Sequence, residues 1–136
     1  MKALARLIPT LLLIFVSTNL FAEEAPLKVD GATTVDAVKA KELFDQGVLF
    51  VDPRRISDFE AGRIPDAVSL EMKSVFSEAS LAEHAQKSDP IVFYCNGPKC
   101  LRSAKVSKLA IGWGYTNVYY FRDGFPAWQA AGYPTE

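Results

Sequence analysis

The chain contains few residues that bind metals. Its 136 residues include two cysteines, Cys95 and Cys100, and one histidine, His84. A structural zinc site usually takes about four cysteine or histidine ligands in paired spacing. The two thiols and a distant histidine do not meet that requirement. We therefore predict no metal site and no cofactor, and we expect His84 on the exposed side of a helix.

Runs of basic residues are also missing. The chain has 15 lysines and arginines against 16 aspartates and glutamates, which gives a net charge of -1. Proteins that bind nucleic acids usually display a concentrated positive surface. We therefore expect no nucleic-acid partner. Because 49% of the residues are hydrophobic and 23% are charged, with no internal repeat, the composition is typical of one globular domain.

No hydrophobic run is long enough to span a bilayer, which takes about 20 residues. The longest, at 7–16, follows two basic residues and is interrupted by a proline and a threonine. Residues 1–22 end in alanine before an acidic pair, which is the layout of a secretory signal peptide. An uncleaved membrane anchor is the alternative interpretation.

We therefore predict that residues 1–22 are cleaved near Ala22, that 23–27 form a short tail and that 28–136 form the domain. The mature chain would have 13 basic and 16 acidic residues, a net charge of -3. We expect it in the periplasm, with no membrane contact after cleavage.

The remaining sequence alternates apolar runs with amphipathic helical patterns. Strands are predicted at 48–51, 67–70, 90–95 and 117–121, and helices at 35–47, 57–61, 77–88, 102–111 and 125–132. Thr34 and Ser77 are the expected N-caps of two of these helices. The alternation predicts an α/β fold with a mostly parallel sheet.

This order places Cys95 at the carboxyl end of a central strand, before a loop that leads into a helix. Ligands bind at this edge of open α/β sheets. The unpaired N–H groups of a first helical turn favour an anion and lower the pKa of a nearby thiol. Cys95 is therefore the candidate nucleophile.

The loop after Cys95 is the candidate binding site. Glycine and proline allow a tight turn that directs amides inward, and an arginine at the helix start offers a planar fork for an oxyanion. Lys99 would either steer anions or be an ordinary exposed charge. The predicted binding residues are Asn96, Gly97, Pro98, Lys99, Cys100, Leu101 and Arg102.

The role of Cys100 is open at this point. In an oxidising compartment, two cysteines in a short chain usually form a disulfide. Such a bridge requires Cα atoms within about 7 Å. A structural bridge and a reactive pair are both compatible with the sequence.

Three segments together resemble the single-domain rhodaneses, over residues 28–134. "LFVDPRRISDFEAGRIPDAVSL" is similar to the first signature of that family, "GYTNVYYFRDGFPAWQAAGYP" is similar to its closing signature, and "VFYCNGPKCLRSA" lies where its active loop belongs. The matching positions are Asp52, Arg54, Phe59, Glu60, Gly62, Ile64, Pro65, Ala67, Gly124, Ala127, Trp128, Gly132 and Pro134.

The resemblance implies a five-stranded sheet flanked by helices on both faces, and sulfur transfer. Cys95 would take a sulfane sulfur from a small anion such as thiosulfate and pass it, as a persulfide, to cyanide or a thiol. The inward amides and Arg102 would stabilise the charges, so that no general base is needed. We interpret Asp52, Arg54 and Trp128 as structural.

One departure from the family concerns the loop, which has six residues between Cys95 and Arg102 where family members typically have a shorter one. A wider loop would admit a larger anion, so phosphate-ester hydrolysis is a minor alternative. Cys100 suggests another, in which it resolves a Cys95 persulfide and a periplasmic redox partner reduces the resulting disulfide. A non-catalytic module that binds anions or sulfur is the third.

Overall fold

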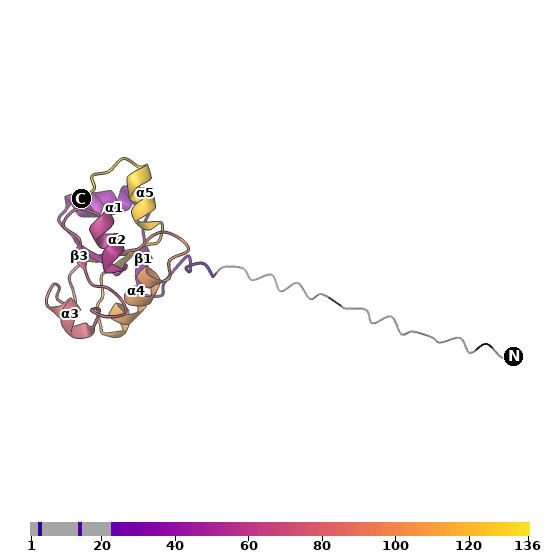
Figure 1. Cartoon of the computed structure of the whole chain (residues 1–136). Helices are drawn as coiled ribbons and strands as arrows, with labels where there is room; N and C mark the ends of the chain where they lie inside the picture. Colours follow the sequence, from indigo (N-terminus) through magenta and orange to yellow (C-terminus); the bar gives the residue numbers. More distant parts are fainter. Residues whose placement is uncertain (1–2, 4–13, 15–22) are drawn as a thin grey trace.

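The computed structural model describes Ala3, Ile14 and residues 23–136 (Figure 1). The predicted signal peptide therefore lies almost entirely outside the described residues. Within the described part of the chain, no helix is long and apolar enough to cross a bilayer. In chain order the elements are β1 (Ala32–Thr34), α1 (Ala37–Asp45), β2 (Leu49–Asp52), α2 (Ile56–Ala61), β3 (Val68–Ser69), α3 (Glu78–Ala82), β4 (Ile91–Tyr94), α4 (Arg102–Gly112), β5 (Val118–Phe121) and α5 (Gly124–Ala130).

The five strands form one sheet in the order β1-β5-β4-β2-β3, and every neighbouring pair is parallel. This confirms the predicted α/β fold with a parallel sheet. Strand β4 is central, and its Phe93 lies opposite Val51 on one side and Tyr120 on the other. All four β4 residues are buried, as expected for a strand covered on both faces.

Helices cover both faces of the sheet, as predicted (Figure 1). Alternate β4 residues enter different cores because successive side chains point to opposite faces. Val92 and Tyr94 pack in the core that contains residues of α1 and α5. Ile91 and Phe93 pack in the core formed with α3 and α4. The carboxyl end of β4 is thus held between two packed layers.

The first strand differs from the sequence-based prediction. Residues 32–34 form edge strand β1 rather than the approach to a helix, and Thr34 is in that strand. The cap of α1 is Asp36, whose carboxylate accepts a hydrogen bond from the Lys39 N–H at 2.8 Å. A three-residue strand with polar threonines has too little hydrophobic alternation to be detected in the sequence.

Two helices also differ in extent or orientation. Helix α3 ends at Ala82 rather than near residue 88, although Ser77 is its N-cap, as predicted. Helix α1 spans Ala37–Asp45 rather than 35–47; Ala40 and Leu43 are buried, and Val38 is 60% exposed. Val38 lies five residues before Leu43, about 140° around the helix, so the two do not share a face. His84 is exposed, as expected, but it lies in a turn after the end of α3 rather than on a helix.

Helix α5 begins directly against the loop that follows β4. The Phe125 N–H donates to the Cys95 carbonyl oxygen at 2.9 Å. Gly124 has a φ of +61°, and a Cβ added there would lie 2.2 Å from the same carbonyl oxygen. Only glycine allows this approach, so Gly124 fixes the backbone of Cys95.

We expect Gly124→Ala to destabilise the protein more than Gly47→Ala. Gly47 also has a positive φ, +79°, but no atom lies within 4 Å of its added Cβ. Gly47→Ala should therefore lose about 1–2 kcal/mol to backbone strain. Gly124→Ala should lose a further 1–3 kcal/mol, roughly, because the loop must move. Urea unfolding of both variants measures the difference, and equal losses would show that the contact is unimportant.

Candidate active site

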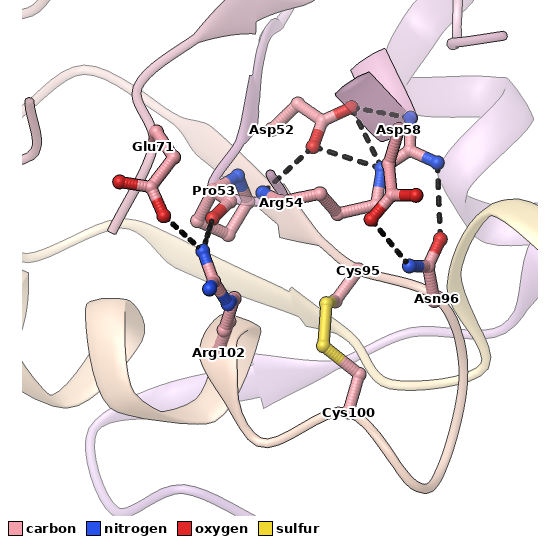
Figure 2. Close-up of a disulfide and its surroundings, with 9 residues drawn as sticks. All are labelled: Asp52, Pro53, Arg54, Asp58, Glu71, Cys95, Asn96, Cys100 and Arg102. Carbon is pink, nitrogen blue, oxygen red and sulfur yellow. Dashed lines mark hydrogen bonds and ion pairs between the residues drawn. A yellow bond between two sulfur atoms is a disulfide. The ribbon is translucent and has the colours of Figure 1, made fainter. Parts of the chain in front are cut away.

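Cys95 and Cys100 form a disulfide in the loop after β4 (Figure 2). Their Cα atoms are 6.1 Å apart, within the range that a bridge requires. The two side chains are therefore close enough to form a bridge, which the sequence alone could not establish. Cys95 is fully buried in this state, and Cys100 is partly exposed. The pair has to be reduced before Cys95 can act as a nucleophile.

The loop turns tightly and then enters α4. Gly97 is buried with a φ of +114°, and its carbonyl oxygen accepts a hydrogen bond from the Cys100 N–H at 2.9 Å. The Lys105 N–H donates to the Leu101 carbonyl at 3.1 Å, which begins the helical pattern. The N–H groups in the first turn of α4 have no acceptor within the helix and point back toward the loop. Asn96, Pro98 and Lys99 are exposed, and Leu101 is partly exposed.

A buried ion pair connects β2 to this loop. The Arg54 Nε atom lies 2.9 and 3.0 Å from the two Asp52 carboxylate oxygens, and Nη2 lies 2.7 Å from one of them. Arg54 also donates to the Gly62 carbonyl at 2.7 Å and to the Asn96 side-chain oxygen at 3.0 Å (Figure 2). Arg54 therefore links Asp52 to the residue after Cys95, and the structural role that we inferred for the pair stays a prediction.

The charge of Arg54 is maintained despite its burial. The side chain is 3% exposed and that of Asp52 is 0% exposed. Desolvation lowers the pKa of Arg54, but the hydrogen bonds and the negative charge of Asp52 outweigh it and raise the pKa above its usual value. Breaking such a pair leaves an uncompensated buried charge, which is strongly destabilising.

Arg102 was predicted to bind an oxyanion, and the structure pairs it with Glu71. The Nη1 atom donates to the Glu71 carboxylate and, at 3.1 Å, to the Pro53 carbonyl (Figure 2). The hydroxyl of Ser74 donates to the same carboxylate at 2.6 Å. The hydrogen bond from Ser74, followed by that from Arg102, lowers the pKa of Glu71 to about 2. Arg102 is thus at the cavity with its charge largely neutralised, and anion binding by it stays a prediction.

A cavity of about 370 Å³ opens beside the disulfide. It is lined by Arg54, Arg55, Asp58, Cys95, Asn96, Cys100 and Arg102. Of the predicted site residues, the cavity brings together Cys95, Asn96, Cys100 and Arg102, but Gly97, Pro98, Lys99 and Leu101 do not line it. The sequence reasoning missed Arg55 and Asp58, at the start of α2. Their place three and six residues after the end of β2 was the available signal.

The segment predicted as a short tail packs against the loop. Ala25 is 3% exposed, and its N–H donates to the Pro98 carbonyl at 2.7 Å. The Ala25 carbonyl accepts hydrogen bonds from Arg122 Nε at 3.1 Å and Nη2 at 2.9 Å. The Tyr120 hydroxyl donates to the Pro26 carbonyl at 2.9 Å. These residues therefore hold the exposed side of the loop, a role that no sequence pattern indicated.

Other candidate residues lie in the core. Trp128 is fully buried, and its Nε1 donates to the Pro134 carbonyl at 2.7 Å; its structural role stays a prediction. Ser103 and Ser107 in α4 are fully buried, and their hydroxyls have no partner among the described residues. No group of three or more histidine, cysteine or acidic residues within the described ranges is arranged to hold a metal ion.

We expect Glu71→Gln to change how stability depends on pH. A carboxylate whose pKa is lowered on folding stabilises the native state above its unfolded pKa, near 4.5, and this contribution is lost as pH falls toward about 2. The variant should therefore lose less unfolding free energy between those pH values than the natural chain.

Denaturant unfolding across this pH range measures the effect, with Glu60→Gln on the exposed surface as the matched control. If the pH profile of Glu71→Gln coincides with that of the natural chain, the Arg102–Glu71 pair does not have the strength that we assign to it.

Comparison with known proteins gives a consistent match. The family model described as Rhodanese-like domain matches residues 36–131. Thiosulfate sulfurtransferase GlpE of Pseudomonas savastanoi pv. phaseolicola is 33% identical over 98 residues, which cover 72% of this chain and 87% of that protein.

Solved structures show the same fold. The Alr3790 protein from Anabaena sp. has a TM-score of 0.66 at 25% identity, covering 75% of this chain and 90% of that one. RPA3614 from Rhodopseudomonas palustris CGA009, a protein of unknown function described as a possible tyrosine phosphatase, has a TM-score of 0.61 at 32% identity. That match covers 77% of this chain and 85% of the other.

Proposed function

The chain belongs to the rhodanese-like domain family, and on that basis we propose that it is a sulfurtransferase that works through a persulfide on Cys95. The similarity to GlpE supports sulfur transfer in general. Thiosulfate as donor, cyanide or a thiol as acceptor, and a periplasmic location are our specific proposals.

The position of Cys95 is the observation on which this proposal depends. The residue follows the central strand directly, faces the cavity and precedes the first turn of the 11-residue helix α4. The field of that helix favours the thiolate over the thiol and stabilises an anion beside it. Both properties are required of a cysteine that attacks an anionic sulfur donor.

The proposed reaction has two steps. The Cys95 thiolate attacks the sulfane sulfur of thiosulfate, the S–S bond of thiosulfate breaks, and sulfite leaves with the bonding electrons. Cys95 is then a persulfide. Cyanide attacks the outer sulfur, forms thiocyanate and returns the thiolate. No proton is transferred in either step, so the site needs preorganised charge rather than a general base.

The observed disulfide favours a second candidate function. With Cys100 within bonding reach of Cys95, its thiolate would attack the inner sulfur of the Cys95 persulfide and release sulfide. The sulfane sulfur is reduced while the two cysteines are oxidised to the disulfide, so electrons balance. A dithiol redox partner would then restore the thiols by exchange. In this mode the protein reduces sulfane sulfur.

Two variants test the proposal and separate the two functions. Cys95→Ser should lose thiocyanate formation from thiosulfate and cyanide, by at least about 1000-fold, because the nucleophile is gone. Cys100→Ser should retain transfer to cyanide, because the resolving thiol is not needed. Assays on pre-reduced protein measure both rates.

Sulfide release without an added acceptor provides the second readout. The reduced natural chain should release at most one sulfide per chain and end as the disulfide, and Cys100→Ser should release none. If Cys95→Ser retains full transfer to cyanide, Cys95 is not the nucleophile. If Cys100→Ser loses transfer to cyanide, Cys100 belongs to the catalytic route.

A further inference from the structure

Most charged groups around the cavity are already neutralised. Arg54 is paired with Asp52, both nearly inaccessible to solvent. Arg102 is paired with Glu71, and those side chains are 15% and 10% exposed. These two arginines therefore add little net positive charge to the cavity.

One cation and one anion remain. Arg55 and Asp58 both line the cavity, and neither forms a salt bridge within the described part of the chain. One carboxylate oxygen of Asp58 accepts a hydrogen bond from the side-chain nitrogen of Asn96, the residue after Cys95, at 3.3 Å (Figure 2). Its carboxylate retains other lone pairs that can accept from a ligand.

The two charged residues lie in one turn that lines the cavity. Arg55 is the N-cap of α2, and Asp58 lies three residues later in its first turn. The Asp58 N–H donates to the Arg55 carbonyl oxygen at 3.0 Å, so the two residues belong to one turn beside the cavity. The two side chains do not pair with each other. A ligand with an ammonium and a carboxylate attached to the same carbon atom could contact both.

We propose that the sulfur acceptor is a thiol-bearing α-amino acid of the cysteine type, with its carboxylate on Arg55 and its ammonium on Asp58. This inference rests on the proposed sulfurtransferase function. The acceptor thiol passes its proton to the anionic persulfide on Cys95, and the resulting thiolate attacks the outer sulfur. The bond from that sulfur to Cys95 breaks, the proton stays on the transferred sulfur, and an amino-acid persulfide leaves while the Cys95 thiolate is regenerated. The sulfane sulfur moves without net oxidation.

Four thiols test the two contacts separately. Cysteine has both charges, cysteamine only the ammonium, 3-mercaptopropionate only the carboxylate, and 2-mercaptoethanol neither. With pre-reduced protein and saturating thiosulfate, sulfite release reports turnover for every acceptor. For each thiol, the KM of the variant is divided by the KM of the natural chain. This ratio removes the differences in intrinsic reactivity between the thiols.

Asp58→Asn should raise KM about tenfold for cysteine and cysteamine, the size of one charged hydrogen bond, and should not raise it for 3-mercaptopropionate. The asparagine can still accept the hydrogen bond from Asn96. Arg55→Gln should raise KM about tenfold for cysteine and 3-mercaptopropionate but not for cysteamine. The exposed residue Glu60 provides the control, and Glu60→Gln should leave all four KM values unchanged.

The inference is wrong if both variants change all four thiols by the same factor, or if the natural chain shows no lower KM for cysteine than for 2-mercaptoethanol. Thermal unfolding of each variant shows whether a uniform loss reflects misfolding, in which case Asp58→Glu and Arg55→Lys replace them in the same comparison. Transfer to cyanide by the natural chain separates the two claims. If it occurs without the thiol selectivity, only this inference fails; if it does not occur, the proposed function fails as well.

Discussion

The buried ion pair between Asp52 and Arg54 is the constraint on which the site depends. Two opposite charges removed from water are stable only when their hydrogen bonds are satisfied, and losing one partner costs about 3–5 kcal/mol. Here the guanidinium bonds the Asp52 carboxylate, the Gly62 carbonyl and the Asn96 side chain. It therefore joins the end of β2, the end of α2 and the loop that contains both cysteines. The charged pair fixes the position of Asn96, next to Cys95.

Two other contacts hold the same loop. At the start of α5, the Phe125 N–H donates to the Cys95 carbonyl oxygen, and this oxygen lies too close to Gly124 for any side chain at that position. The segment before β1 holds the Pro98 carbonyl through Ala25. Because Cys95 follows a buried strand and has its carbonyl bonded, its backbone is rigidly placed. This geometry explains how Cys95 can line the cavity while Cys100 lies within disulfide distance of it.

The sequence predicted the parts of this structure that come from long, continuous patterns. The central strand, helix α4 and the place of Cys95 between them follow from an uninterrupted apolar run and an amphipathic one. Strand β1 was missed because three residues with two threonines have no clear period. The contact of Ala25 with the loop was missed because it is a backbone hydrogen bond between distant segments, for which side-chain identity gives no signal.

The net charge of the cavity could not be predicted from the sequence either. An arginine at a helix start predicts an anion site, but its partner Glu71 is 31 residues away. Pairings over such separations depend on how β3, α3 and α4 pack together. The place of Asp58 at the site was missed for the same reason, because its contact with Asn96 joins residues that are 38 apart in the sequence. The result is a cavity whose charges nearly cancel, where the linear pattern favoured a cationic one.

The central claim is that Cys95 accepts sulfur, and intact mass spectrometry of the reduced protein tests it most directly. We expect the mass to rise by one sulfur atom after thiosulfate is added, with the sulfur located on Cys95 and removed by cyanide. If Cys100 resolves the persulfide, the mass should instead fall by two hydrogens as sulfide appears, which still requires sulfur to have passed through Cys95. A mass that stays unchanged, with no sulfide released, would contradict the account.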